Sequence, residues 1–235
     1  MAPTRVDLEI VSHLRLVVLF TGRFLRSSIK DEPMDQLILR TNQLRSERNF
    51  LSIEATLDLA DRDNVILDPW SVLISASAKV GSGNIFYPNV TIECSTSSSA
   101  NIGSANTFCS GSLVVAMNAG AIEIGDANEF GDGLAIKANR NGSLVRIGSN
   151  CRLISGAQVM GRTTIGSGSQ IIGSIVVQDC QLDEGEPYSG TNPDLRGAVL
   201  KGQGLARSLH VPRGGVINGA GDFSASQIEL QSSYH

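Results

Sequence analysis

An apolar residue recurs every six positions from residue 80 to residue 177, and this period constrains the fold more than any other feature of the chain. The phase holds if four residues are skipped after Ile92, four after Val114 and five after Ile136. A helix repeats every 3.6 residues and an ordinary strand every two, so neither explains a period of six. The series contains only branched aliphatic residues and Phe: Val80, Phe86, Ile92, Ile102, Phe108, Val114, Ile124, Phe130, Ile136, Ile147, Leu153, Val159, Ile165, Ile171 and Val177.

Six-residue units of this kind predict a three-sided coil, in which each unit is a short strand plus a turn and three units close one level. Successive levels then stack as parallel sheets about 4.8 Å apart. We expect Phe86, Phe108 and Phe130 to form a ladder inside the coil. A glycine follows the first apolar residue of each level, and we expect it to give the corner a left-handed backbone; these are Gly81, Gly103, Gly125, Gly148 and Gly166. A corner ladder is expected from Asn84, Asn106 and Asn128, either as left-handed residues or through amide-to-amide hydrogen bonds.

The skipped residues predict excursions from the third side of three successive levels, at 93–101, 115–123 and 137–146. Insertions of a repeat protein collect on one face, which often binds something, but surface slack is also tolerated there. The candidate interaction loop is Asn139, Arg140, Asn141 and Arg146. A further hypothesis is that Arg140 and Arg146, with Arg152 and Arg162, gather an anionic ligand on one side.

Four segments follow from the pattern. They are an N-terminal helical or capping segment at 1–60, the coil at 61–182, a loop insertion at 183–209, and a closing coil and tail at 210–235. Within the first, 7–29 has a roughly helical apolar pattern, a second helix is expected to begin near Pro33, and 52–67 alternates like a strand. These helices are expected to cap the open sheet edges, or else to form a partner-binding or trimerising arm.

Composition excludes several classes of partner and site. The formal net charge of −4 gives no support for nucleic-acid binding. The apolar run at 16–20 is far shorter than the ~20 residues of a membrane span. The four cysteines form no C-x-x-C pair, so reduced thiols in a cytoplasmic protein are expected, with a weak mitochondrial presequence as the alternative. Asp126 and Asp132 fall on different outer faces in the six-residue phase, so no metal site is expected.

These six-residue units resemble the hexapeptide-repeat superfamily, whose fold is a left-handed parallel β-helix. The resemblance resumes in a closing coil at Val211, Pro212, Gly214, Val216 and Gly219. It implies an all-β coil of about six or seven levels with an N-terminal helical appendage.

The commonest activity in the superfamily is acyl transfer from acetyl-CoA or acyl carrier protein, usually by a trimer with a histidine as base. The chain has His13, His210 and His235, none of them in the regular coil, so His210 is only a weak catalytic candidate. A γ-class carbonic anhydrase, which requires three zinc-binding histidines in the coil, is excluded.

A second resemblance concerns the layout "NAGAIEIGDANEF", a long excursion, and then "SLVRIGSNCRL". It is similar to the pointed-end β-helix subunits of dynactin, which implies a cap and adaptor without a metal or a catalytic histidine. The sequence therefore favours a non-catalytic scaffold that binds other protein subunits and needs no cofactor. The alternative is an atypical acyltransferase, dependent on acetyl-CoA or an acyl carrier and self-associated as a homotrimer.

Overall fold

The computed structural model describes residues 33–234 of the chain, which divides into two compact units, Met1–Leu44 and Arg45–His235. The helix expected near Pro33 is confirmed as α2 (Met34–Glu47), whose first turn closes where the Gln36 and Leu37 amides donate to the Pro33 carbonyl. The helix expected at 7–29 lies outside the described residues. None of the helices between residues 33 and 234 is long and apolar enough to cross a membrane.

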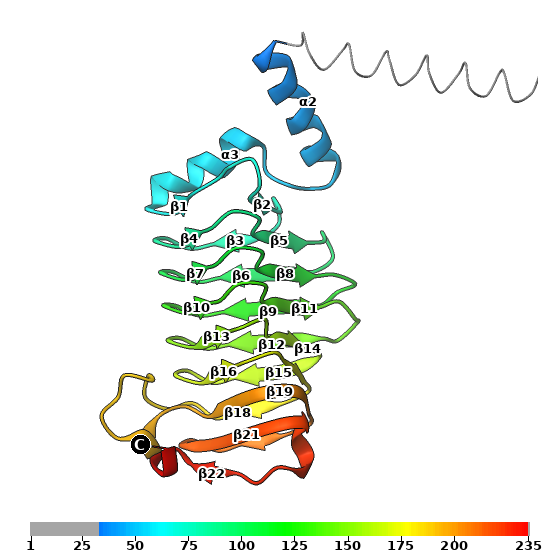
Figure 1. Cartoon of the computed structure of the whole chain (residues 1–235). Coiled ribbons are helices and arrows are strands. Elements are labelled where there is room, and N and C mark those ends of the chain that lie inside the picture. The colour runs from blue at the N-terminus through cyan, green and yellow to red at the C-terminus, as the bar shows by residue number, and fades with distance from the viewer. Residues whose placement is uncertain (1–32, 235) are drawn as a thin grey trace, which may run out of the picture. The chain divides into compact units, whose positions relative to one another are not determined.

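The second unit is a left-handed parallel β-helix with three faces, which Figure 1 shows as a stack of similar levels. Face 1 carries β1 (Val65–Ile66), β4 (Ile85–Phe86), β7 (Thr107–Phe108), β10 (Glu129–Phe130), β13 (Arg152–Ile154) and β16 (Gln170–Ile172). Face 2 carries β2 (Leu73–Ile74), β5 (Thr91–Cys94), β8 (Leu113–Ala116), β11 (Ala135–Ala138), β14 (Gln158–Met160) and β17 (Ile175–Gln178). Face 3 carries β3 (Lys79–Val80), β6 (Ser99–Ile102), β9 (Ala121–Ile124), β12 (Leu144–Ile147), β15 (Arg162–Ile165), β18 (Gln181–Leu182) and β20 (His210–Val211). The seven strands of face 3 agree with the predicted number of levels.

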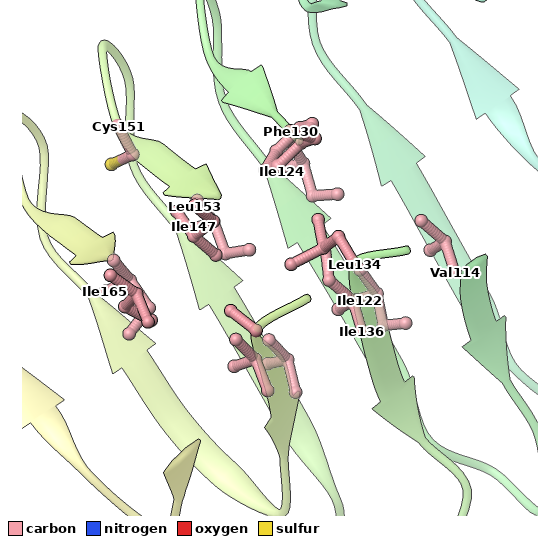
Figure 2. Packing of buried hydrophobic residues seen from close by; sticks show 14 of the residues in the cluster. Val114, Ile122, Ile124, Phe130, Leu134, Ile136, Ile147, Cys151, Leu153 and Ile165 are labelled. Atoms are coloured by element: carbon pink, nitrogen blue, oxygen red, sulfur yellow. The ribbon is translucent and has the colours of Figure 1, made fainter. Parts of the chain in front are cut away.

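The interior contains every residue of the six-residue series, and none of these side chains is more than 7% exposed. Figure 2 shows several of them, including Ile124 and Ile147, pointing into the space between the faces. The predicted Phe ladder is confirmed: the ring centroids of Phe86 and Phe108 lie 5.3 Å apart, and those of Phe108 and Phe130 lie 4.7 Å apart. The sequence period therefore gives the core of this unit directly.

The predicted asparagine ladder forms through amide-to-amide hydrogen bonds and not through left-handed backbones. The Nδ2 of Asn106 donates to Asn84 Oδ1 at 3.0 Å, and the Nδ2 of Asn128 donates to Asn106 Oδ1 at 2.8 Å. The ladder is longer than predicted, because Asn64 stands above Asn84 and the Cys151 amide donates to Asn128 Oδ1 below. Each buried amide thus satisfies polar groups of the levels on both sides.

The glycine after the first apolar residue was predicted to give the corner a left-handed backbone, and this prediction is wrong. It does not take a positive φ; that conformation occurs two residues later, for example at Ala105 with φ 57°. Gly103 is needed because a Cβ there would lie 2.5 Å from the Gly125 carbonyl oxygen of the next level. Close stacking of backbones, and not corner conformation, explains this repeated glycine.

The three excursions are confirmed as a stack at one corner, but they are shorter than predicted. Most of their residues extend the strands of faces 2 and 3, and only tight turns project, as seen beside β5, β8 and β11 in Figure 1. Each turn is closed by a backbone hydrogen bond, such as Ser98 N to Ser95 O at 3.0 Å and Ser143 N to Arg140 O at 2.9 Å. Asn118 Nδ2 donates to the Asn139 carbonyl at 3.0 Å and so links two of the turns.

The strand expected at 52–67 is wrong for most of its length, because the segment forms α3 (Ile53–Leu57) and the 3-10 helix η1 (Asp58–Arg62). Ser52 caps α3 by accepting from the Ala55 amide, so local capping chemistry wins over the alternating pattern. Leu59 joins the hydrophobic core, and Arg62 donates to the Val80 carbonyl at 2.9 Å. This part of the predicted N-terminal segment therefore covers the end of the coil.

The stretch 183–209 is a loop only as far as residue 198, with one 3-10 turn, η2 (Pro193–Leu195). β19 (Val199–Arg207) then returns to the stack and pairs with β16 on face 1 and β17 on face 2. The closing coil follows as β20 and β21 (Gly215–Asp222), and η3 (Phe223–Ala225) comes next. The antiparallel β22 (Glu229–Leu230) pairs with β21, and η4 (Gln231–Tyr234) follows it. We call residues 183–198 the insertion loop.

The stacking role of Gly103 predicts opposite effects at two nearby positions. Gly103→Ala should lower the free energy of unfolding by about 1–3 kcal/mol, because the new methyl group meets the next level. Ala105→Gly should be neutral or stabilising by up to about 1 kcal/mol, because it relieves a left-handed alanine. Urea unfolding of both variants tests this, and a larger loss for Ala105→Gly would contradict it.

The buried amide ladder predicts a large effect at its centre. Asn106→Leu should lower the free energy of unfolding by about 2–5 kcal/mol, because Asn128 and the Gly125 carbonyl lose their hydrogen-bond partners inside the coil. The control is Asn101→Leu on the outer side of β6, where we expect a change within about 0.5 kcal/mol. Thermal or urea unfolding measures both, and equal losses at the two sites would show that the ladder is not special.

Candidate functional site

His210 forms an ion-pair geometry with Asp183 on the outer side of the coil. The Nε2 of His210 lies 2.9 Å from Asp183 Oδ2, and the two side chains are 61% and 34% exposed. His210 lies on β20 opposite Gln181 of β18, and Asp183 follows the end of β18 directly. The pair therefore comes from two neighbouring levels of face 3.

Asp183 is held as a carboxylate by several contacts. A hydrogen bond from the Gln181 side chain at 3.0 Å, and then the contact with His210, lower the pKa of this carboxyl group below its usual range. Its backbone is fixed as well, because its amide donates to the Val211 carbonyl and its own carbonyl accepts from Ala198. An anionic carboxylate can only accept, so Nε2 carries the proton donated to Asp183, and in the neutral imidazole Nδ1 is the unprotonated nitrogen.

The insertion loop begins at Asp183 and folds over face 1. Its two arms are joined by backbone hydrogen bonds from Glu186 N to Leu195 O at 2.8 Å and from Gly197 N to Glu186 O at 3.0 Å. Arg196 reinforces the loop by donating through Nε and Nη2 to the Gly190 carbonyl. At its far side the Tyr188 ring covers the Arg152 guanidinium, whose carbon lies 4.5 Å from the ring centroid.

A groove of about 320 Å³ lies between this loop, the last levels of face 1 and the C-terminal turn. We call it the loop groove, and it is lined by Arg152, Gln170, Ile172, Tyr188, Arg196, Val199, Lys201, Val216, Gln231 and Tyr234. Three of these side chains are cationic and none is acidic. The loop groove is therefore a positively charged hollow with tyrosines at its rim.

The other side of Tyr188 borders a second hollow of about 470 Å³, over the corner next to face 1. Cys151 and Glu129 lie in it, and Glu129 Oε2 accepts from Arg152 Nε at 2.7 Å. Burial raises the pKa of the Cys151 thiol to about 12, so this cysteine is a core group and not a nucleophile.

The residues predicted as an interaction loop do not form one cluster. Asn139, Arg140 and Asn141 are exposed on the projecting turn, as predicted. Arg146 instead lies on the outer side of β12, where its Nε donates to Glu123 Oε2 of the preceding level at 2.7 Å. An exposed pair of this kind contributes little to stability and leaves Arg146 partly neutralised.

The four arginines considered for an anion site also lie apart. Arg146 and Arg162 belong to strands of face 3, whereas Arg152 is on face 1 under the insertion loop. The prediction that they gather on one side is therefore wrong, because the coil distributes neighbours in sequence over three faces. Sequence reasoning placed Arg152 in the wrong group and missed Tyr188, Lys201 and Asp183.

The side chains of residues 33–234 form no group of three or more His, Cys, Asp or Glu that could hold a metal ion. Asp126 accepts from the Ser104 amide at 2.7 Å and so caps a turn of the neighbouring level.

Thiol burial predicts a simple labelling pattern. Cys94, Cys151 and Cys180 are buried and Cys109 is half-buried, and all four are free thiols. The pKa of Cys109 and that of Cys180 are also raised by burial, so both stay protonated well above neutral pH. At pH 8 iodoacetamide should modify Cys109 alone, and slowly, in the folded protein, and all four thiols in urea. Mass spectrometry of the labelled peptides checks this; fast labelling of Cys151 in native buffer would contradict it.

Comparisons with known proteins give a fold and not a family. No protein-family model and no curated protein matches the chain. One similar structure is a mutant of GDP-perosamine N-acetyl transferase from Caulobacter crescentus, in complex with CoA and GDP-perosamine. It is 20% identical with a TM-score of 0.41, and the match covers 81% of this chain and 74% of that one. LpxA from Acinetobacter baumannii is 18% identical with a TM-score of 0.37, and the match covers 73% of each chain. The UDP-N-acetylglucosamine acyltransferase of Francisella novicida is 15% identical with a TM-score of 0.37, and the match covers 72% of this chain and 71% of that one.

The likeness to these enzymes concerns the fold alone. The six-residue register and the three parallel faces define the class of this protein as a left-handed parallel β-helix built from six-residue units.

Proposed function

We propose that the protein is an acyltransferase of the hexapeptide-repeat type in which His210, oriented by Asp183, is the general base. The observation that carries the proposal is the 2.9 Å contact between His210 Nε2 and Asp183 Oδ2. General-base catalysis requires a proton acceptor that the substrate can reach, and the His210 side chain is 61% exposed. The resemblance of the coil to the hexapeptide-repeat superfamily supports acyl transfer as the reaction.

In this reaction His210 Nδ1 removes the proton from a hydroxyl or amine of the acceptor while that oxygen or nitrogen attacks the carbonyl of an acyl thioester. The carbon–sulfur bond then breaks, and the proton passes from the imidazolium to the departing thiolate. Asp183 stabilises the transient imidazolium without itself taking the proton, as a carboxylate does in a catalytic triad. Acetyl-CoA or an acyl carrier thioester is the donor, and a homotrimer is the expected assembly.

A non-catalytic adaptor is the second candidate function, and the projecting turns of the corner favour it. Asn139, Arg140 and Asn141 are exposed on a turn that is linked by a hydrogen bond to the turn of the level before it. A stacked and rigid surface of this kind suits binding of other protein subunits, with Arg146 beside it on face 3. Cytoplasmic localisation is part of both hypotheses.

Acyl transfer predicts that His210→Asn keeps donor binding and loses turnover. Wild-type protein with acetyl-CoA and a panel of amino and hydroxyl sugars should release CoA, and the variant should release it about 10²–10⁴-fold more slowly. Acetyl-CoA at about 100 times its dissociation constant should stabilise both proteins against heat by ~2.7 kcal/mol. The unfolding midpoint without ligand should not change, because the imidazole is mostly exposed.

The control variant is Arg213→Gln, an exposed change near His210 in the sequence that should keep full turnover. Absence of any thermal shift with acetyl-CoA and other acyl thioesters, together with no thiol release, would overturn the enzyme hypothesis and favour the adaptor. Sedimentation of the wild-type protein measures its oligomeric state in solution, and the enzyme hypothesis predicts a trimer.

A further inference from the structure

The loop groove has a floor and a rim that suit a flat ring. Val199 and Val216 of its floor are each only 5% exposed, and Ile172 of β16 adds a third aliphatic side chain to the lining. The Tyr188 and Tyr234 rings stand at the rim and are 47% and 43% exposed. Aromatic rings of this kind stack on a planar ligand with little loss of conformational entropy.

The cations of the groove have hydrogen-bond donors to spare. Arg152 uses Nε for Glu129, and its Nη1 and Nη2 make no hydrogen bond with the residues described. The Lys201 ammonium likewise has no hydrogen-bond or ion-pair partner in the part of the chain that the structure describes. Arg196 is committed to the Gly190 carbonyl and serves to hold the loop. Lys201 is thus available for charge-assisted hydrogen bonds to an anion, and so are the two Nη groups of Arg152, although Glu129 offsets part of the Arg152 charge.

Two carboxylates near the groove are paired with groups that line it. Glu129 binds Arg152 from the second hollow, on the far side of Tyr188, and Glu229 accepts from the Tyr234 hydroxyl. Glu129 offsets part of the Arg152 charge, but none of the lining residues is acidic and Lys201 adds a positive charge, so the lining favours anions although the whole chain carries a net charge of −4.

The dimensions limit the ligand to a small molecule. Arg152 is in register with Gln170 of the next level, and Gln170 is in register with Val199 of the level after it, on the strand that carries Lys201. Two levels correspond to about 10 Å along the coil at ~4.8 Å each. A volume of about 320 Å³ lies at the small end of ligand sites, which span roughly 300–1,000 Å³.

We propose that the loop groove binds a phosphate ester that carries a flat ring, with its phosphate at Lys201 and Arg152 and its ring against Tyr188 and the aliphatic floor. The site is preformed, because the insertion loop is closed by its own backbone hydrogen bonds and by the Arg152–Tyr188 contact. It lies on face 1, whereas His210 is on face 3, so this binding does not depend on acyl transfer.

Calorimetric titration of the full chain with AMP tests the proposal, with ribose 5-phosphate, adenosine and inorganic phosphate as comparison ligands. AMP should bind at one site per chain, and each comparison ligand at least about tenfold more weakly, because ribose 5-phosphate and inorganic phosphate lack the ring and adenosine lacks the phosphate. Lys201→Gln and Tyr188→Leu should each weaken AMP binding about five- to twentyfold. Raising the salt concentration should weaken it further.

The matched control is Lys79→Gln, an exposed lysine on β3 at the opposite end of the coil, which should bind AMP like the wild type. His210→Asn should also bind AMP normally, so a failure of the acyl-transfer hypothesis is distinguishable from a failure of this one. No AMP binding at millimolar concentration would overturn the proposal. So would binding of inorganic phosphate as tight as that of AMP, or AMP binding that is equal in wild type, Lys201→Gln and Tyr188→Leu.

Discussion

The close stacking of parallel backbones is the constraint on which the rest of this structure depends. Each level donates and accepts backbone hydrogen bonds with the levels beside it, so every residue at a given position of the repeat meets its equivalent one level away. That geometry leaves no room for a Cβ at Gly103, aligns Phe108 with Phe130, and places Asn106 where its amide bonds to Asn84 and Asn128. One spacing therefore explains the glycine, the aromatic ladder and the buried amides together.

The same stack separates chemistry that the sequence holds close together. Residues on consecutive strands project from different faces, so Arg146 pairs with Glu123 on face 3 while Arg152 pairs with Glu129 on face 1. Functional groups can converge only along one face or across one corner. His210 and Asp183 meet in this way, from neighbouring levels.

The insertion loop adds what a regular coil lacks, which is a concave surface. A coil of this kind offers flat faces, on which outward side chains stand in rows and enclose little volume. By folding over face 1 and fixing Tyr188 on Arg152, the loop turns a flat stretch of sheet into a groove with a floor, a rim and a charge. Face 3 keeps His210 and Asp183 on its outer side, so the two candidate sites lie on different faces of the coil.

The sequence by itself determined the coil, its interior and its stacked corner turns, because these depend on a period that any reader can count. Ile124, Phe130 and Ile136 point inward for the same reason that they recur every six residues. Local chemistry beyond the period was harder to predict. Residues 53–62 form helical turns because Ser52 caps them, and the repeated glycines allow close stacking of the levels and do not take a left-handed backbone.

The candidate sites were decided only by the tertiary structure. Asp183 meets His210 across 27 residues that include a loop of irregular length, which carries no register in the sequence. Tyr188, Arg152 and Lys201 likewise come together only because that loop folds back over two levels of the coil, a path set by its own hydrogen bonds and by no repeat.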